Sequence, residues 1–190
     1  MSERSAEEKN VRERLIEEGV RELYAHGTQG FSLRRVAQNC GVSCAAPYRH
    51  FQDKQSLLEA VADAINMRWY ERQSQALDAC RQNGEEPLRI VCREYLRFLW
   101  DNPEFCVLAT QRDTQTGKWL LNRLFGESPL TQQLIRDYIH RHGISEQEAY
   151  ERTYVLRSLL YGAAMLNVQN DMTMTAGVYS ALCAAIDAQI

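Results

Sequence analysis

The sequence contains no long apolar run and no regular strand-like alternation of apolar and polar residues. None of its apolar stretches approaches the roughly 20 residues that a membrane-spanning helix needs, so we expect no membrane partner. The N-terminal stretch MSERSAEEKN is polar and charged, which argues against a signal peptide. No internal repeat or low-complexity segment is present. These absences favour an all-α globular protein, which we expect in the cytoplasm.

The motifs of common metal and cofactor enzymes are also missing. The six cysteines are scattered, without a Cys-x-x-Cys pair or a histidine cluster, so no zinc site is expected. There is no Walker loop, no glycine-rich dinucleotide fingerprint and no His-Glu-x-x-His sequence. No glutamate has a histidine three residues later, as a di-iron bundle requires. We therefore predict a non-enzyme with no cofactor, no metal and no catalytic residue, whose thiols are reduced and mostly buried.

Charge is unevenly distributed along the chain. The net charge of −3 at first argues against a nucleic-acid partner. Residues 28–54, however, carry four basic side chains against one acidic, whereas residues 61–190 carry 13 basic and 16 acidic. Because salt confines surface fields to about 10 Å, a polyanion responds to the patch that faces it. The segment 28–54 is therefore compatible with DNA binding.

Residues 31–54 carry the pattern of two short helices joined by a tight turn. Ser32 can cap the first helix, whose apolar positions recur at helical spacing. After the turn at Gly41, Ser43 is expected to cap the second helix. Pro47 falls in the first turn of this helix and would distort its start without abolishing it. The pattern predicts a helix-turn-helix, whose second helix fits a DNA major groove.

At these residues the sequence resembles a known family. The stretch GVSCAAPYRHFQDKQSLL, preceded by FSLRRVAQNCG, is similar to the N-terminal DNA-binding domain of TetR-family transcriptional regulators. The specific part is the ending Tyr-x-His-Phe-x-x-Lys, and the resemblance covers roughly residues 10–65. It implies a three-helix DNA-binding domain over residues 1–53 and a helical ligand-binding and dimerisation domain over residues 54–190.

The resemblance implies two kinds of DNA contact. Tyr48, His50 and Lys54 match positions that hold phosphates, although Tyr48 could instead pack in the core and His50 could be structural. The positions that face bases are matched by Arg34, Cys44 and Ala45. Ser32 and Ser43 could donate to phosphates or only cap their helices. Arg35 is expected to be a solvated surface charge.

The remaining chain is predicted to form helices with recognisable ends. Asp53 is a good cap for a long helix over 54–82, and Gly84 would end it. Ser145 and Glu148 form a capping box. The other expected helices are one ending near Gly27, one from Pro87 to about 101, one from 103 to about 112, a short one near 118–125, one from Pro129 to Gly143, one from 145 to about 169 and one over 174–189.

The resemblance further implies a small-molecule pocket among the C-terminal helices. The candidates are aromatic and apolar residues at helical spacing, which more often form core than a ligand site. They are Trp69, Tyr95, Leu99, Trp100, Phe105, Trp119, Phe125, Tyr161 and Met165.

The last two predicted helices are apolar around most of their circumference. A terminal helix on a monomer should have a polar outer face, so we expect a second copy of the chain to cover both helices. The alternative is that they line a large core. The candidate dimer residues are Leu156, Leu159, Leu160, Ala163, Leu166, Val178, Tyr179, Leu182 and Ile186.

The sequence thus favours a ligand-responsive transcriptional regulator. The leading hypothesis is a homodimeric repressor that binds a palindromic DNA operator and is released by a small-molecule inducer. The alternative is a helical scaffold or small-molecule-binding protein without a DNA function.

Overall fold

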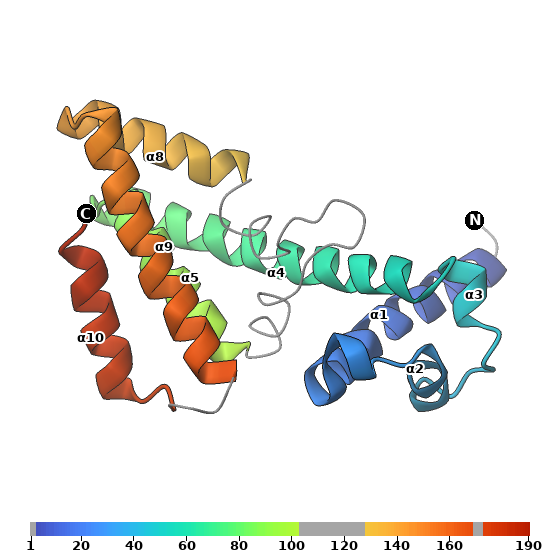
Figure 1. The fold of residues 1–190 in the computed structure, drawn as a ribbon. Helices are drawn as coiled ribbons and strands as arrows, with labels where there is room; N and C mark the ends of the chain where they lie inside the picture. The colour runs from blue at the N-terminus through green and yellow to red at the C-terminus, as the bar shows by residue number, and fades with distance from the viewer. Residues whose placement is uncertain (1–2, 103–127, 169–172) are drawn as a thin grey trace. The chain divides into compact units, whose positions relative to one another are not determined.

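The computed structural model describes residues 3–102, 128–168 and 173–190. This part of the chain consists of eight helices joined by turns, without a strand (Figure 1). It divides into two compact units, Met1–Met67 and Arg68–Ile190. In the described ranges no helix is long and apolar enough to cross a membrane. The all-α fold class predicted from the sequence is confirmed. The helices expected between residues 103 and 127 lie outside the described residues.

The first unit is a small helical domain around one core. Its elements are α1 (Glu3–Gly30), α2 (Leu33–Asn39), α3 (Pro47–His50) and the first part of α4 (Lys54–Asn83). Within α1 the helical backbone is broken at Gly27, whose φ of 63° most other residues avoid, and one more turn follows. The side chains buried in this core include Leu15, Leu23, Phe31, Val36, Leu57 and Val61.

A glycine allows α1 and α4 to approach each other closely. A β-carbon built at Gly19 would lie 2.7 Å from Cγ2 of Val61, which is closer than carbon atoms pack. Leu57 and Phe31 would also be within 3.7 Å of that carbon. The absence of a side chain at position 19 is therefore a condition of this packing.

The beginning of the second short helix differs from the prediction. We expected Ser43 to cap it, but α3 begins at Pro47, the residue before it is Ala46, and no side chain caps it. A helix capped at Ser43 would need an N–H at position 47 to donate to the Ser43 carbonyl, and proline has none. Instead the Ala46 N–H donates to this carbonyl at 2.9 Å, which closes a tight turn. The first turn of the expected helix is thus a turn that precedes α3.

The second unit is a bundle built around α5. It contains the rest of α4 together with α5 (Pro87–Asp101), α8 (Pro129–His142), α9 (Glu146–Val168) and α10 (Ala176–Asp187). α5 packs against α8, α9 and α10 (Figure 1). Its inner face is fully buried through Val91, Cys92, Tyr95 and Leu96.

Side-chain caps set the helix starts as the sequence predicts. Asp53 Oδ1 accepts from the Ser56 N–H at 2.8 Å, and Ser145 Oγ accepts from the Glu148 N–H at 3.2 Å. Gly84 and Gly143 follow α4 and α8 with φ values of 66° and 61°.

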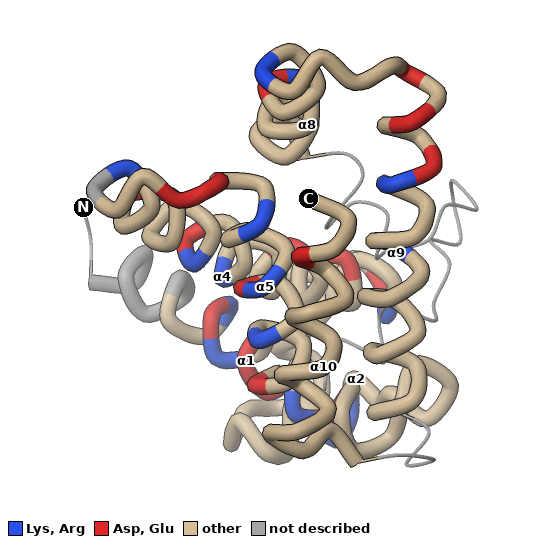
Figure 2. The backbone as a smooth tube through the Cα atoms, turned by 90° about the vertical axis from the view of Figure 1, so that its left-hand side faces the viewer, with Lys and Arg blue, Asp and Glu red and all other residues tan. Residues whose placement is uncertain are grey.

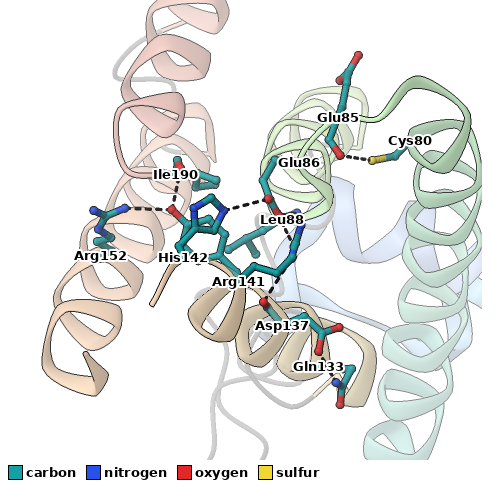
Figure 3. Close-up of polar contacts among 11 residues, drawn as sticks. Cys80, Glu85, Glu86, Leu88, Gln133, Asp137, Arg141, His142, Arg152 and Ile190 are labelled. Carbon is teal, nitrogen blue, oxygen red and sulfur yellow. Dashed lines mark hydrogen bonds and ion pairs between the residues drawn. The ribbon is translucent and has the colours of Figure 1, made fainter. Parts of the chain in front are cut away.

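Polar contacts join the ends of the helices in the second unit. The Glu86 carboxylate before α5 accepts from Arg141 Nη2 at 2.8 Å and lies 3.4 Å from His142 Nε2, at the end of α8 (Figure 3). Arg93 on α5 pairs with Asp187 at the end of α10, with Nε 2.9 Å from Oδ1. These pairs fix α8 and α10 relative to α5.

Candidate nucleic-acid interface

The residues predicted to contact DNA lie on the turn and helices of the first unit, and most are open to solvent. Arg34, Ser43, Cys44, Ala45 and Tyr48 are exposed, whereas Ser32, His50 and Lys54 are half-buried. The Tyr48 side chain is 61% exposed, so it is not a core residue. A set of exposed basic, aromatic and small residues is compatible with a DNA-facing surface.

Ser32 acts as a helix cap, as predicted. Its hydroxyl oxygen accepts from the Arg35 N–H at 3.4 Å, and α2 begins at the next residue. The Ser32 N–H itself donates to Glu22 Oε1 at 2.9 Å. Ser32 can therefore offer DNA its half-exposed hydroxyl but not its amide.

Arg35 lies at the surface, as expected, but its charge is paired. Its Nε donates to Glu22 Oε1 at 2.9 Å, and its Nη2 donates to the Gly30 carbonyl. This interaction with the Glu22 carboxylate raises the pKa of Arg35. Arg35 therefore joins α2 to α1 and is not available as a free cation for DNA.

A row of contacts along α1 holds α2 in place. Glu22 is only 3% exposed, and it serves both Arg35 and the Ser32 amide. One turn earlier, Glu18 Oε1 accepts from Asn39 Nδ2 at 2.7 Å, and Arg14 donates to the Cys40 carbonyl. Sequence reasoning missed this row. The signal that was available is the spacing of Glu18 and Glu22, which places two acids next to Leu15 and Leu23 on the buried side of a helix.

Lys54 is the first residue of α4 and lies against the domain core. Its Nζ is 5.9 Å from the centre of the Phe31 ring, a cation–π contact, and the residue is half-buried. The first turn of α4 contains no acidic residue, but the N–H of Ser56 in this turn is already taken by the capping carboxylate of Asp53. A positive charge beside the positive end of a helix favours an anion such as a phosphate.

The pocket candidates that the structure describes fall into two groups. Trp69, Tyr95 and Leu99 are buried in the second unit, with the rings of Trp69 and Tyr95 in edge contact at 4.8 Å. Trp100, Tyr161 and Met165 are half-buried, and Trp100 lies 5.3 Å from the ring of Tyr179. Phe105, Trp119 and Phe125 lie outside the described residues.

The dimer candidates also separate by burial. Leu156, Leu160, Ala163 and Ile186 are buried inside the subunit itself. Leu159, Tyr179 and Leu182 are half-buried, and Leu166 and Val178 are exposed. The prediction that a second copy covers this face therefore depends on the half-buried and exposed residues.

A shallow apolar groove of about 260 Å³ runs between α9 and α10. Figure 2 shows that the half of α9 after Arg157 and nearly all of α10 carry no Lys, Arg, Asp or Glu. The groove is lined mainly by Leu159, Gly162, Ala163, Leu166, Val178 and Leu182.

The described residues show no site for a metal ion. Within the ranges that the structure covers, no group of three or more His, Cys, Asp or Glu residues could hold one. Cys40, Cys80 and Cys92 are buried free thiols, and Cys44 is exposed.

The first unit matches a known protein family, and the fold is similar to that of solved structures. The family model of the bacterial regulatory proteins of the tetR family matches residues 15–61. A search of curated proteins found no match. Among solved structures, the fold is similar to that of a Clostridium perfringens protein assigned as a fatty acid metabolism regulator, with a TM-score of 0.69 and 16% identity over 93% of this chain and 98% of that chain.

Two further solved structures share the fold. A transcriptional regulator from Rhodococcus sp. Rha1 has a TM-score of 0.65 and 21% identity, over 94% of this chain and 92% of that one. A single-residue variant of TetR from Acinetobacter baumannii AYE, in complex with minocycline, has a TM-score of 0.59 and 21% identity, over 92% of this chain and 91% of that chain. The family match assigns residues 15–61 to the tetR family of bacterial regulatory proteins, and the chain shares the fold of these solved transcriptional regulators.

Proposed function

We propose that the chain is a homodimeric repressor that binds a palindromic DNA operator and leaves it when a small inducer binds. The proposal rests on the geometry of the first unit. Its buried core and the Glu22–Arg35 ion pair hold the turn and the two short helices in place, and the residues proposed to face DNA lie along their exposed edge. Such a regulator works where the DNA is, so we place it in the cytoplasm.

The proposed DNA contacts divide between affinity and sequence selectivity. Tyr48, His50 and Lys54 hold phosphates, and Arg34 reads a base edge, for which a guanine is the natural partner. Cys44 and Ala45 are small and exposed on the turn before α3. We propose that they contact thymine methyl groups, and that DNA shape supplies part of the selectivity.

The groove between α9 and α10 supports the homodimer. Its lining is apolar, and a second copy of the same two helices would present a matching surface. Two copies would place two DNA-binding domains on one duplex, and the half-sites would lie about one DNA turn apart or slightly more.

The inducer response is proposed to act through α4. This helix contributes Lys54 and the following residues to the first unit and its later residues to the second. A shift of α4 on ligand binding would change the spacing of the two DNA-binding domains. The inducer must then bind the released conformation more tightly, since equal affinity for both conformations shifts nothing. The minocycline complex of the similar Acinetobacter protein supports a small molecule as the effector.

Selection of bound sequences from a random duplex library tests the proposal. The purified protein should enrich a two-fold palindrome, and its affinity should fall steeply with salt because counterions are released. A folded protein that enriches no motif, and whose binding to duplex DNA does not depend on salt, would instead be the helical scaffold without a DNA function.

Lys54→Ala tests the phosphate contact within that proposal. We expect weaker binding to all sequences and a salt slope reduced by about one, since one phosphate contact is lost. Arg81→Ala, an exposed cation in the last turn of the same helix, is the matched control. An unchanged slope for Lys54→Ala would remove Lys54 from the phosphate contacts.

A further inference from the structure

Two polar atoms on α4 are buried in the second unit without a hydrogen-bond partner. Trp69 and Gln73 both have 0% of their surface exposed. Among the described residues, neither Nε1 of Trp69 nor Oε1 of Gln73 has a hydrogen-bond partner. The amide nitrogen of Gln73 is satisfied, because it donates to Thr131 Oγ1 at 3.0 Å. One donor and one acceptor are therefore left over.

The two side chains lie on the same side of the helix. Residues four apart in an α-helix are neighbours on its surface, with β-carbons about 5–6 Å apart. One molecule can therefore reach both. Buried polar groups in native proteins are nearly always paired, so an unpaired donor and an unpaired acceptor on side chains one helical turn apart point to a partner outside the described residues.

The surroundings of the two atoms indicate what kind of partner fits. The Trp69 ring packs on the rings of Tyr95 at 4.8 Å and Phe98 at 5.5 Å, so the local environment is aromatic. Arg72, between the two residues in sequence, is already paired with Glu94 at 3.1 Å and Asp101 at 2.9 Å. A charged ligand would have to leave water without a free counter-charge from this cation.

We propose that the inducer is an uncharged molecule with an adjacent hydrogen-bond acceptor and donor, as in a carboxamide on an aromatic ring. Its carbonyl accepts from Trp69 Nε1, and its N–H donates to Gln73 Oε1. This inference rests on the proposed inducer response and names the chemistry of the site. The apolar part of the molecule packs on the aromatic residues around Trp69.

Calorimetric titration of the full chain with three related probes, in the absence of DNA, tests the chemistry. Benzamide carries both groups, N,N-dimethylbenzamide lacks the donor, and benzoate is charged. Benzamide should bind at millimolar concentration. N,N-Dimethylbenzamide should bind about threefold to tenfold more weakly, the effect of losing one neutral hydrogen bond, and benzoate should not bind. Equal affinity for all three probes, or no binding of benzamide, overturns the proposal.

Variants assign the binding to the two residues. Trp69→Phe removes the N–H and keeps an aromatic ring, and Gln73→Met removes the amide at similar length. Each should weaken benzamide binding about threefold to tenfold. The controls are Tyr150→Phe and Gln75→Met, which each remove a polar group from a similar side chain at an exposed position of the second unit and should leave the affinity unchanged. Equal losses in variants and controls overturn the proposal. If a variant fails to fold, the comparison of the three probes on the unmodified chain still decides.

The outcomes separate this inference from the proposed function. If benzamide binds as described but no ligand releases the operator complex, the site chemistry stands and the inducer response fails. If another compound releases the operator equally well from the Trp69→Phe and Tyr150→Phe proteins, the inducer response stands and the site chemistry is wrong.

Discussion

At the scale of single residues, the position of α2 depends on Glu22. This carboxylate accepts from the Ser32 amide and from the Arg35 guanidinium, and it is almost completely buried. Hydrogen bonds between a buried carboxylate and a cation are stronger than neutral ones. The same acid thus fixes the residue before α2 and a residue within it, so it positions Arg34 between them.

Glu22→Gln should lower stability and weaken DNA binding together. Glutamine keeps the shape but loses the negative charge and one acceptor, so the Arg35 side chain loses its ionic partner. We expect a lower urea midpoint and a several-fold weaker affinity for duplex DNA. Glu17→Gln, an exposed acid on the same helix, is the control and should change neither. A loss of equal size in both variants would contradict the assignment.

Cys92 predicts a pH dependence of stability. Its thiol is buried within α5, and burial raises its pKa from 9.0 to about 12. A group whose pKa is raised in the folded state stabilises the fold in full at pH values below its unfolded-state pKa. This stabilisation is lost as the pH rises from the unfolded-state pKa through the folded-state pKa. The chain should therefore lose about 1.4 kcal/mol of unfolding free energy per pH unit between roughly pH 9 and 12 from this group.

Urea unfolding at a series of alkaline pH values measures this effect. The difference in stability between the unmodified protein and Cys92→Ala should shrink as the pH rises, because the variant has no thiol to ionise. A difference that stays constant up to pH 12 would show that Cys92 does not contribute.

At the scale of elements, the sequence located helices well where a cap or a glycine set their ends. The caps Asp53 and Ser145 and the glycine after α8 fall where they were predicted. The prediction was wrong for α3, because the lost N–H of Pro47 moves the helix start by a full turn. It also missed the ion pair of Arg35, because the acidic partner lies 13 residues earlier and no local pattern connects the two. Contacts between elements are not encoded in spacing along one element.

The approach of α1 to α4 gives a prediction at this scale. Gly19→Ala places a methyl group against Val61, so we expect a loss of about 1–3 kcal/mol in unfolding free energy from overpacking. Gly177→Ala is the control, because the nearest atom to its added carbon is 3.8 Å away in the first turn of α10. That change should be neutral or slightly stabilising, by up to about 1 kcal/mol. Thermal or urea unfolding of the two variants measures both effects, and equal stabilities would show that α1 and α4 have room to separate.

At the scale of the whole molecule, the site predictions were less complete than the fold. Arg34 and Tyr48 could be predicted as DNA contacts because the helix-turn-helix sequence is local and specific, and both are exposed as such contacts require. Among the dimer candidates, Leu160 and Ile186 are buried within the subunit, since an apolar pattern does not distinguish a core from an interface. Effector chemistry was not readable from the sequence, because it depends on which polar atoms remain unpaired after folding.

Leu166→Glu should dissociate the proposed dimer. Leu166 lines the groove between α9 and α10 and is 42% exposed, so a charge there would be buried without a partner in the dimer. The protein should change from dimer to monomer in sedimentation experiments and lose affinity for a palindromic duplex. Leu130→Glu, at 41% exposure on α8, is the control and should remain dimeric. A dimeric Leu166→Glu protein would place the interface elsewhere.

The exposed thiol of Cys44 has a practical consequence. It lies on the turn before α3, where the protein is proposed to meet base pairs, while Cys40, Cys80 and Cys92 are buried. A duplex whose modified base carries a mixed disulfide could exchange with the Cys44 thiolate, which releases the small thiol and links the base to Cys44 without introducing a new cysteine. Moving the modified base along the operator would then map the docking register one base pair at a time, and the linked complex could be isolated for structure determination.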